Sequence, residues 1–151
     1  MKTLHFKEFI QAPVETVWDT MLGDATYREW STAFNPGGYF QGNWSEGSKM
    51  LFLGPDLEGN EGEGGMVSRI QENRKNEFVS IEHYGFVKDG IEDTTSDEVK
   101  KWAGSHENYT FIEKEGGTEV SVDIDVAEEY ETMFEEMWPK ALESLKVLSE
   151  K

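Results

Sequence analysis

The segment from Tyr130 to Leu148 restricts the fold of this chain more than any other part of its sequence. On a helix its apolar residues fall in one arc about 180° wide, whereas a surface helix needs an apolar stripe of only about 100°. These residues are Tyr130, Met133, Phe134, Met137, Trp138, Ala141, Leu142, Leu145 and Leu148. Pro139 falls on the opposite, polar arc, where a proline bends a helix convex toward solvent. We therefore expect a long C-terminal helix that wraps over a curved partner.

The strand pattern before this helix predicts what the partner is. Between residues 119 and 126, valine and isoleucine alternate with acidic residues and serine. One face of that strand is therefore buried and the other wet, as in an antiparallel sheet. Gly116 and Gly117 predict the turn of a hairpin that joins it to the strand of Tyr109 and Phe111.

The remaining segments predict two short helices, one long loop and further strands of the same sheet. Pro13 marks the start of a helix that ends at Gly23, and Asp24 is expected to cap a second short helix that runs to about Trp30. Residues 86–105 form a long loop in which Ser96 caps a short helix. The expected strands comprise residues 4–10, 39–44, 49–53, 66–70 and 77–85 and the two strands of the hairpin. The predicted class is α+β, with the order β-α-α-β6-α and a curved antiparallel sheet around the last helix.

Composition limits the partners and the compartment. The 151 residues suit one domain, residues 1–151, with a formal net charge of −17. This charge argues against nucleic acid, whose affinity comes from Lys and Arg, and against anionic membrane surfaces. The chain has no cysteine, and we find no signal peptide and no apolar run long enough to span a bilayer. We expect a cytoplasmic protein that does not insert into membranes.

Several segments together resemble a known superfamily. IQAPVETVWDTML followed by YREWS is similar to the opening of START-like (SRPBCC) domains, within the family of homologues of the heat-shock-protein-90 ATPase activator. WSEGSKMLFL, GGTEVSVDI and WPKALESLKVL agree with its later strands and closing helix. HYGFVKDGIEDTTSDEVKKWAGSHENYTF resembles bacterial members with a long acidic loop.

The resemblance implies the helix-grip fold, in which an antiparallel sheet grips the C-terminal helix and leaves a hydrophobic cavity between them. Members of the superfamily bind lipids, polyketides, sterols or flavonoid-like molecules, and some are cyclases, hydrolases or co-chaperones. The fold does not choose among these functions.

Large aromatic and methionine side chains are the candidates for the wall of such a cavity. Methionine adapts to varied ligands, and aromatic rings bring apolar area with a polar tip on Trp or Tyr. For any one of these residues the alternative is a packed core. With one histidine, the predicted ligand-binding residues are Trp18, Met21, Trp30, Phe52, Met66, His83, Tyr109, Phe111, Met133, Phe134, Met137 and Trp138.

Evidence for catalysis is weaker. His83 and His106 flank the long loop, so they could meet at a cavity mouth and, with Glu82 or Glu107, orient a ligand or transfer protons. The alternative is two rim histidines. No nucleophile pairs with a base in the sequence, so we predict no catalytic residue, no cofactor and no metal site. The acidic segment from Asp56 to Glu63 lacks the glycine and glutamate spacing of a calcium loop and is expected to be a solvated turn.

We therefore expect a protein that binds a small hydrophobic or aromatic ligand in an internal cavity. One alternative is an acid–base enzyme that acts on such a ligand. Another, less favoured because no extra N-terminal domain is present, is a co-chaperone with a heat-shock protein as its partner. The chain is expected to be a monomer or a homodimer.

Overall fold

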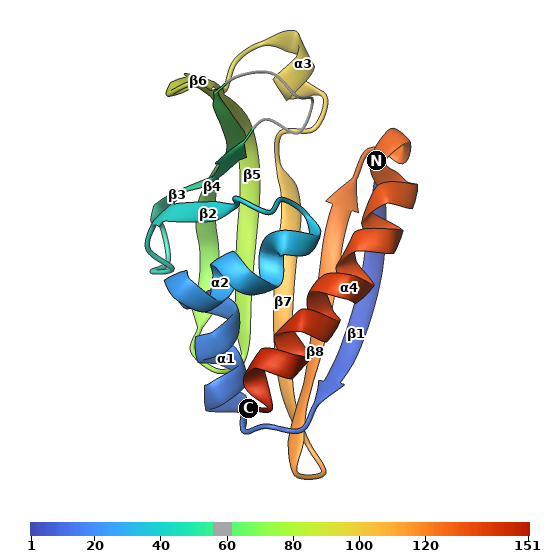
Figure 1. Cartoon of the computed structure of the whole chain (residues 1–151). Coiled ribbons are helices and arrows are strands. Elements are labelled where there is room, and N and C mark those ends of the chain that lie inside the picture. Colours follow the sequence, from blue (N-terminus) through green and yellow to red (C-terminus); the bar gives the residue numbers. More distant parts are fainter. Residues whose placement is uncertain (56–61) are drawn as a thin grey trace.

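The computed structural model describes residues 1–55 and 62–151 and has the predicted order of elements (Figure 1). The first strand and two helices are followed by a series of strands and by the long C-terminal helix. In chain order the elements are β1 (Lys2–Ile10), α1 (Val14–Leu22), α2 (Asp24–Trp30), the 3-10 helix η1 (Ser31–Ala33), β2 (Tyr39–Gly42), β3 (Lys49–Pro55), β4 (Glu63–Arg74), β5 (Phe78–Lys88), β6 (Ile91–Asp93), α3 (Asp97–Lys100), β7 (Ser105–Lys114), β8 (Gly117–Val126), η2 (Glu128–Tyr130) and α4 (Glu131–Ser149).

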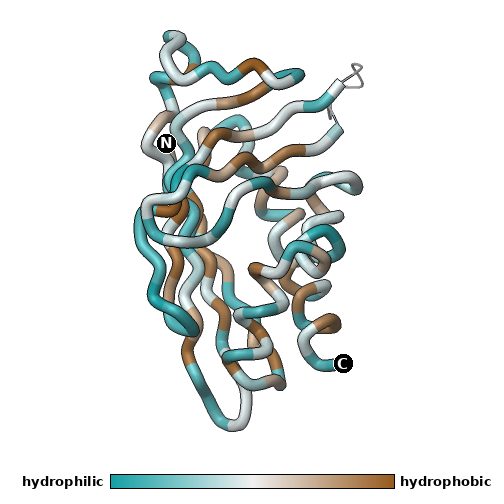
Figure 2. Tube along the Cα trace, turned by 90° about the vertical axis from the view of Figure 1, so that its left-hand side faces the viewer, coloured by the Kyte–Doolittle hydropathy of each residue, from teal (hydrophilic) through white to brown (hydrophobic). Residues whose placement is uncertain are grey.

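The strands form one antiparallel sheet in the order β1-β8-β7-β5-β4-β3-β2, and the short β6 pairs with β5 outside this path. The helices α1, α2 and α4 contact one another and lie on one side of the sheet, which curves around them (Figure 2). The structure is thus α+β, with the sheet gripping the C-terminal helix as predicted. Its inner face, toward α4, carries the apolar alternation of β8, which is Val120, Val122, Ile124 and Val126.

The hairpin β7–β8 forms as predicted, but its turn lies one residue earlier. Lys114 pairs with Gly117, so the two loop residues are Glu115 and Gly116, both with positive φ. Gly117 is the first residue of β8 instead. A Cβ at Gly117 would lie 2.4 Å from the carbonyl oxygen of Ile10, so the glycine permits the close approach of β1.

Three local expectations met different outcomes. Ser96 caps α3 as predicted, because its Oγ accepts the backbone N–H of Val99. Asp24 is wrong as the cap of α2: it is the first helical residue, and Gly23 takes the cap position. The expected long loop contains more regular structure than predicted, since β5 continues to Lys88 and the chain turns back to form β6, which pairs with β5. The predicted acidic turn, apart from Gly62 and Glu63, lies outside the described residues.

Helix α4 has two different inner halves. Ala141, Leu142 and Leu145 in its C-terminal half are fully buried, whereas Met133 and Met137 in its N-terminal half are partly exposed. Pro139 is exposed and lies within the continuous helix, as the sequence predicted. Within the described residues, no helix combines the length and the apolar character needed to cross a membrane.

Candidate functional site

The space between the sheet and α4 is filled with side chains at one end. There the ring of Trp18 on α1 meets that of Phe111 on β7, with centroids 5.0 Å apart. The indole nitrogen of Trp30 donates to the carbonyl oxygen of Met21 over 3.0 Å. These four predicted site residues are buried, and Leu145 of α4 closes the same end. This end is a packed core.

Trp138 forms the centre of a second, aromatic part of the core. Its ring lies 4.9 Å from that of Phe34, 6.0 Å from those of Trp30 and Tyr109, and 6.3 Å from that of Phe6. Trp138 is 2% exposed, and its Nε1 has no hydrogen-bond partner among the residues that the structure describes. The aromatic cluster therefore closes the space beneath the middle of α4.

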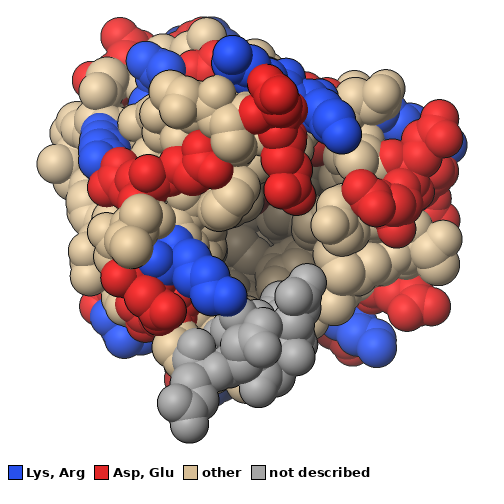
Figure 3. Space-filling view, turned by 90° about the horizontal axis from the view of Figure 1, so that it is seen from above, with Lys and Arg blue, Asp and Glu red and all other residues tan. Residues whose placement is uncertain are grey.

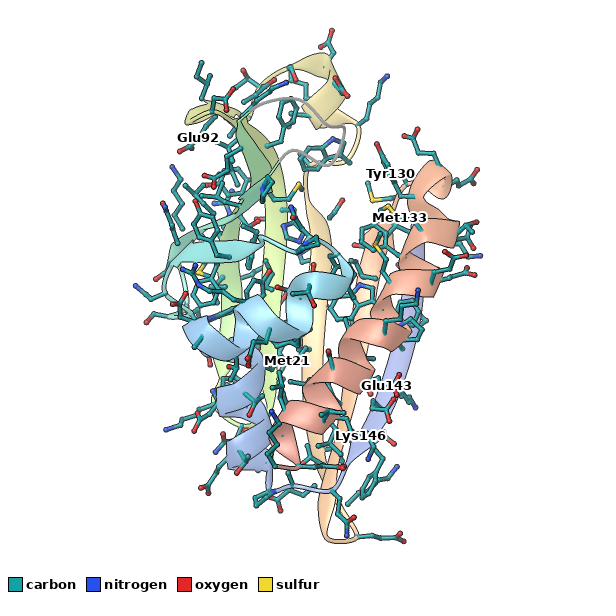
Figure 4. All side chains as sticks on the ribbon, viewed as in Figure 1. Met21, Glu92, Tyr130, Met133, Glu143 and Lys146 are labelled. Atoms are coloured by element: carbon teal, nitrogen blue, oxygen red, sulfur yellow. The ribbon has the colours of Figure 1, made fainter. Side chains whose placement is uncertain are left out.

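Beyond this cluster the inner surface becomes partly exposed. Met133, Phe134 and Met137 on α4, and Phe52 and Met66 on β3 and β4, are all accessible to solvent, although they are apolar. Figure 3 shows the molecule hollowed at this end, with uncharged walls and with both acidic and basic residues around the rim. Figure 4 shows Met133 and Tyr130 at the same end of α4, with Met133 on the side of the sheet. We call this depression the hollow.

A chain of four polar side chains lies on the inner face of the sheet at the hollow. The Ser68 hydroxyl lies 2.5 Å from Nδ1 of His83, and Nε2 of His83 lies 3.1 Å from Oε1 of Glu107. The other Glu107 oxygen accepts the hydroxyl of Tyr109. With His83 protonated on Nε2, every donor in this chain meets an acceptor. The side chains of His83 and Glu107 keep exposures of 12% and 16%, so solvent reaches them.

Neighbouring elements position this polar chain. Ser68 and His83 are directly opposite each other in the β4–β5 ladder. A register shift between Val67 and Ser68 changes which residues of the two strands pair at this point. Glu107 and Tyr109 are two residues apart on β7 and therefore share a face. The ring of Phe52 stands edge-on to that of His83, with centroids 5.9 Å apart, and joins the polar chain to the apolar wall.

Tyr27 on α2 faces the same region from the helical side. Its ring contacts those of Trp30 and Phe40 at 5.1 Å and that of Phe52 at 6.1 Å. Burial, and then the charge of Glu107, raise the pKa of Tyr27 well above its ordinary value. The same two causes raise the pKa of Tyr109. Both phenols therefore remain protonated donors at neutral pH.

His83 and His106 do not meet, which corrects the expectation from the sequence. The β5–β7 register pairs Glu82 with His106, one residue out of step with His83. His106 consequently points to the outer face, where its Nε2 lies 2.5 Å from Oε1 of Gln71 and its Nδ1 lies 3.8 Å from Asp125. His83 is joined instead by Ser68 and by Glu107, one of the two glutamates that the sequence offers as a partner of the histidines.

Two shallow depressions lie elsewhere on the surface. One is formed by Glu29 and the outer side of α4, and the other by the start of α1 and the turn of the β7–β8 hairpin. Charged, exposed side chains line both of them, and neither contains a group of polar side chains joined by hydrogen bonds. The hollow combines apolar walls with a few placed polar groups, which is the usual character of a ligand site.

Comparison with known proteins supports the fold and no more. No family model matches the chain, and no curated protein matches its sequence. Solved structures do match. The solution structure of the Aha1 dimer from Colwellia psychrerythraea matches with a TM-score of 0.71 at 16% sequence identity. The match covers 99% of this chain and 97% of the Aha1 chain. Protein NE0264 from Nitrosomonas europaea has a TM-score of 0.73 at 15% identity, covering 97% and 92%.

The solution structure of the AHSA1-like protein from Aeromonas hydrophila has a TM-score of 0.70 at 13% identity, covering 97% of this chain and 91% of its own. The chain therefore has the helix-grip fold of Aha1-like and AHSA1-like bacterial proteins over nearly its whole length, as the sequence resemblance implied. That fold is consistent with hydrophobic ligand binding.

Proposed function

We propose that the protein binds a small hydrophobic or aromatic molecule, such as a lipid, a polyketide or a flavonoid-like compound, in the hollow between the sheet and α4. One observation carries the proposal: apolar side chains of the inner face stay accessible at this end, beside an interior hydrogen-bonded group. A soluble domain normally buries such surface, so an uncovered apolar concavity favours a ligand.

The predicted site residues divide into two roles under this proposal. Phe52, Met66, Met133, Phe134 and Met137 contact the ligand, and His83 and Tyr109 contribute the polar end. The remaining predicted residues support the wall from behind, because they are buried in contact with protein; these are Trp18, Met21, Trp30, Phe111 and Trp138.

A thermal-shift and calorimetric screen with apolar compounds tests the proposal. A ligand present at one hundred times its Kd stabilises the folded state by about 2.7 kcal/mol, which for a domain of this size raises Tm by about 5–10 °C. Met133→Glu places a charge in the apolar wall and should abolish the shift. Val147→Glu is the matched control, because Val147 is exposed on the same helix. The proposal fails if no apolar compound raises Tm, or if both variants respond alike.

Acid–base chemistry on the bound molecule is a second candidate, and the contact between His83 and Glu107 favours it. A histidine held by a carboxylate in an accessible hollow is suited to move a proton. His83→Ala should then abolish turnover of a bound compound while binding is retained. His106→Ala serves as the control, since His106 lies on the outer face. Equal turnover in both variants would exclude this candidate.

A further inference from the structure

The interior next to the hollow has no cation of its own for an acidic ligand. All fourteen Lys and Arg residues lie in the described part of the chain, and all except Lys146 are exposed. Lys146 pairs with Glu150, at the end of α4 away from the hollow. Arg69 pairs with Glu82 on the outer face of the sheet. Basic side chains lie at the rim of the hollow (Figure 3), so an anion that enters as deep as Glu107 would lose its hydration at a place where no buried Lys or Arg replaces it.

His83 does not change this conclusion. Both of its ring nitrogens already have partners, one in Ser68 and the other in Glu107. Within the polar end that His83 and Tyr109 form, a free acceptor for an incoming ligand is provided by Glu107, whose two oxygens accept from His83 and Tyr109 and still have lone pairs available. A ligand carboxylate beside Glu107 would face like charge in a poorly solvated place.

Tyr27 adds a requirement of the opposite kind. Its ring lies 6.1 Å from that of Phe52, and the ring of Phe52 lies 5.9 Å from that of His83, which contacts Glu107. Its phenol stays protonated because burial raises its pKa, and none of the hydrogen bonds within the described residues involves its hydroxyl. The ligand group should therefore accept from Tyr27 and donate to Glu107. A hydroxyl group does both, whereas an ammonium group only donates and a carboxylate only accepts.

We propose that the ligand of the hollow is a neutral aromatic molecule that carries a hydroxyl group, held between Tyr27 and Glu107, and that aromatic carboxylates are rejected. This inference rests on the proposed function and adds a rule of selection to it. The aromatic part of the ligand is favoured by the rings at the hollow. Phe40 and Phe52 contact Tyr27, Trp44 contacts Phe40 and Phe52, and Phe34 contacts Phe134 on the side of α4.

Calorimetric titration with four probes of one ring system tests the inference: naphthalene, naphthol, naphthoate and naphthylmethylammonium, substituted at the same ring position. Naphthol should bind at least about tenfold more tightly than naphthoate, because a hydrogen bond to a carboxylate is gained and a like-charge contact is avoided. It should also bind more tightly than the ammonium probe, which leaves Tyr27 without a partner.

Two variants locate the selection. In Glu107→Gln the amide keeps the shape: its oxygen can accept from Tyr109, and its NH2 group can donate to Nε2 of His83 once the imidazole carries its proton on Nδ1. Naphthol and naphthoate should then differ by less than about threefold. Glu82→Gln, which makes the same change in net charge on the outer face, should leave the original ratio intact. Tyr27→Phe keeps the ring contacts and should weaken naphthol several-fold while naphthalene is unaffected, which tests the idea even if Glu107→Gln does not fold.

The outcomes separate this inference from the function it rests on. Naphthoate or the ammonium probe binding as tightly as naphthol would overturn the inference and leave a hydrophobic-ligand protein in place. The inference is equally refuted if Glu107→Gln folds and keeps the original preference, or if Tyr27→Phe binds naphthol as the parent does. If none of the four probes binds, naphthalene included, the proposed function fails and the inference fails with it.

Discussion

Replacing Trp138 with alanine tests whether the space beneath the middle of α4 is solid. Trp138 is 2% exposed and lies within 6.3 Å of four other rings. Truncating a buried Trp to Ala costs about 3–5 kcal/mol where the site cannot collapse. Part of the loss is offset because the indole N–H, which is buried without a partner, is removed as well. We expect a net loss of about 3–4 kcal/mol in the free energy of unfolding.

Urea unfolding followed by circular dichroism measures this loss, and the matched control is Trp102→Ala. Trp102 is partly exposed, and among the described residues its ring contacts that of Phe86, at 6.5 Å. Its replacement should cost less than about 1.5 kcal/mol, as for other incompletely buried positions. For a domain of this size Trp138→Ala should lower Tm by about 6–16 °C.

A small effect would refute the reasoning about the core and change the account of the site. If Trp138→Ala costs no more than Trp102→Ala, the indole is not closely packed, and the hollow extends beneath the middle of α4. Trp138 would then contact ligand directly, as the sequence prediction had it. Trp138→Phe, which keeps a ring and removes the unpaired N–H, should cost less than about 2 kcal/mol and confirms that packing, not the indole nitrogen, carries the loss.

Three further predictions concern the helix, the buried phenols and the outer sheet. Pro139→Ala should stabilise the protein by about 1–3 kcal/mol in urea unfolding, since the exposed proline lies inside α4 and cannot donate a helical hydrogen bond there; an unchanged or lower stability would contradict this. The raised pKa values of Tyr27 and Tyr109 imply stability that is present below the unfolded pKa of 10.0 and lost as pH rises above it, so ultraviolet titration should show two phenols ionising only with unfolding. The pKa of Asp93 is lowered by the backbone N–H of Ser96, so the charged carboxylate stabilises the folded protein. The parent should lose this stabilisation only as the pH falls through the folded pKa of Asp93, whereas Asp93→Asn should lack it at neutral pH as well. Acid unfolding curves that coincide for the two proteins would contradict this.

The sequence predicted those parts of the fold in which one periodic pattern dominates. The alternation of residues 119–126 and the wide apolar arc of α4 each allow one burial pattern, so the sheet, its hairpin and the gripped helix followed. The positions of turns and helix caps do not follow from such a pattern. Gly116 and Gly117 both suit a turn, and only the packing of β1 on Gly117 decides that the turn begins at Glu115. Asp24 suits either a cap or a first turn, and Gly23 takes the cap.

His83 and Tyr109 of the polar group were predicted as site residues, but the sequence analysis joined His83 to His106 and did not include Ser68. Tyr109 and Phe111 are apolar and lie an even number of residues from Glu107, which places Glu107 on their inner face. His106 lies an odd number away and is therefore outside. The same rule puts His83 inside with Val79 and Ile81. Pairing the histidines because they flank one loop ignored this parity. Ser68 required the register of β4 on β5, which includes a bulge that no residue pattern announces.

The position of these polar side chains beside the apolar wall of the hollow is relevant to the proposed function. A carboxylate, an imidazole and two hydroxyls on an inner face are costly to desolvate, and apolar residues of similar size often give equal or greater stability in such a place. The fold therefore does not need Ser68, His83, Glu107 and Tyr109 to be polar in order to form. They stand at the point where the solid core of Trp138 gives way to the accessible methionines of α4. Under the proposed function, the polar group at that boundary would meet the polar part of the ligand, and Glu107 would be the acceptor that it offers.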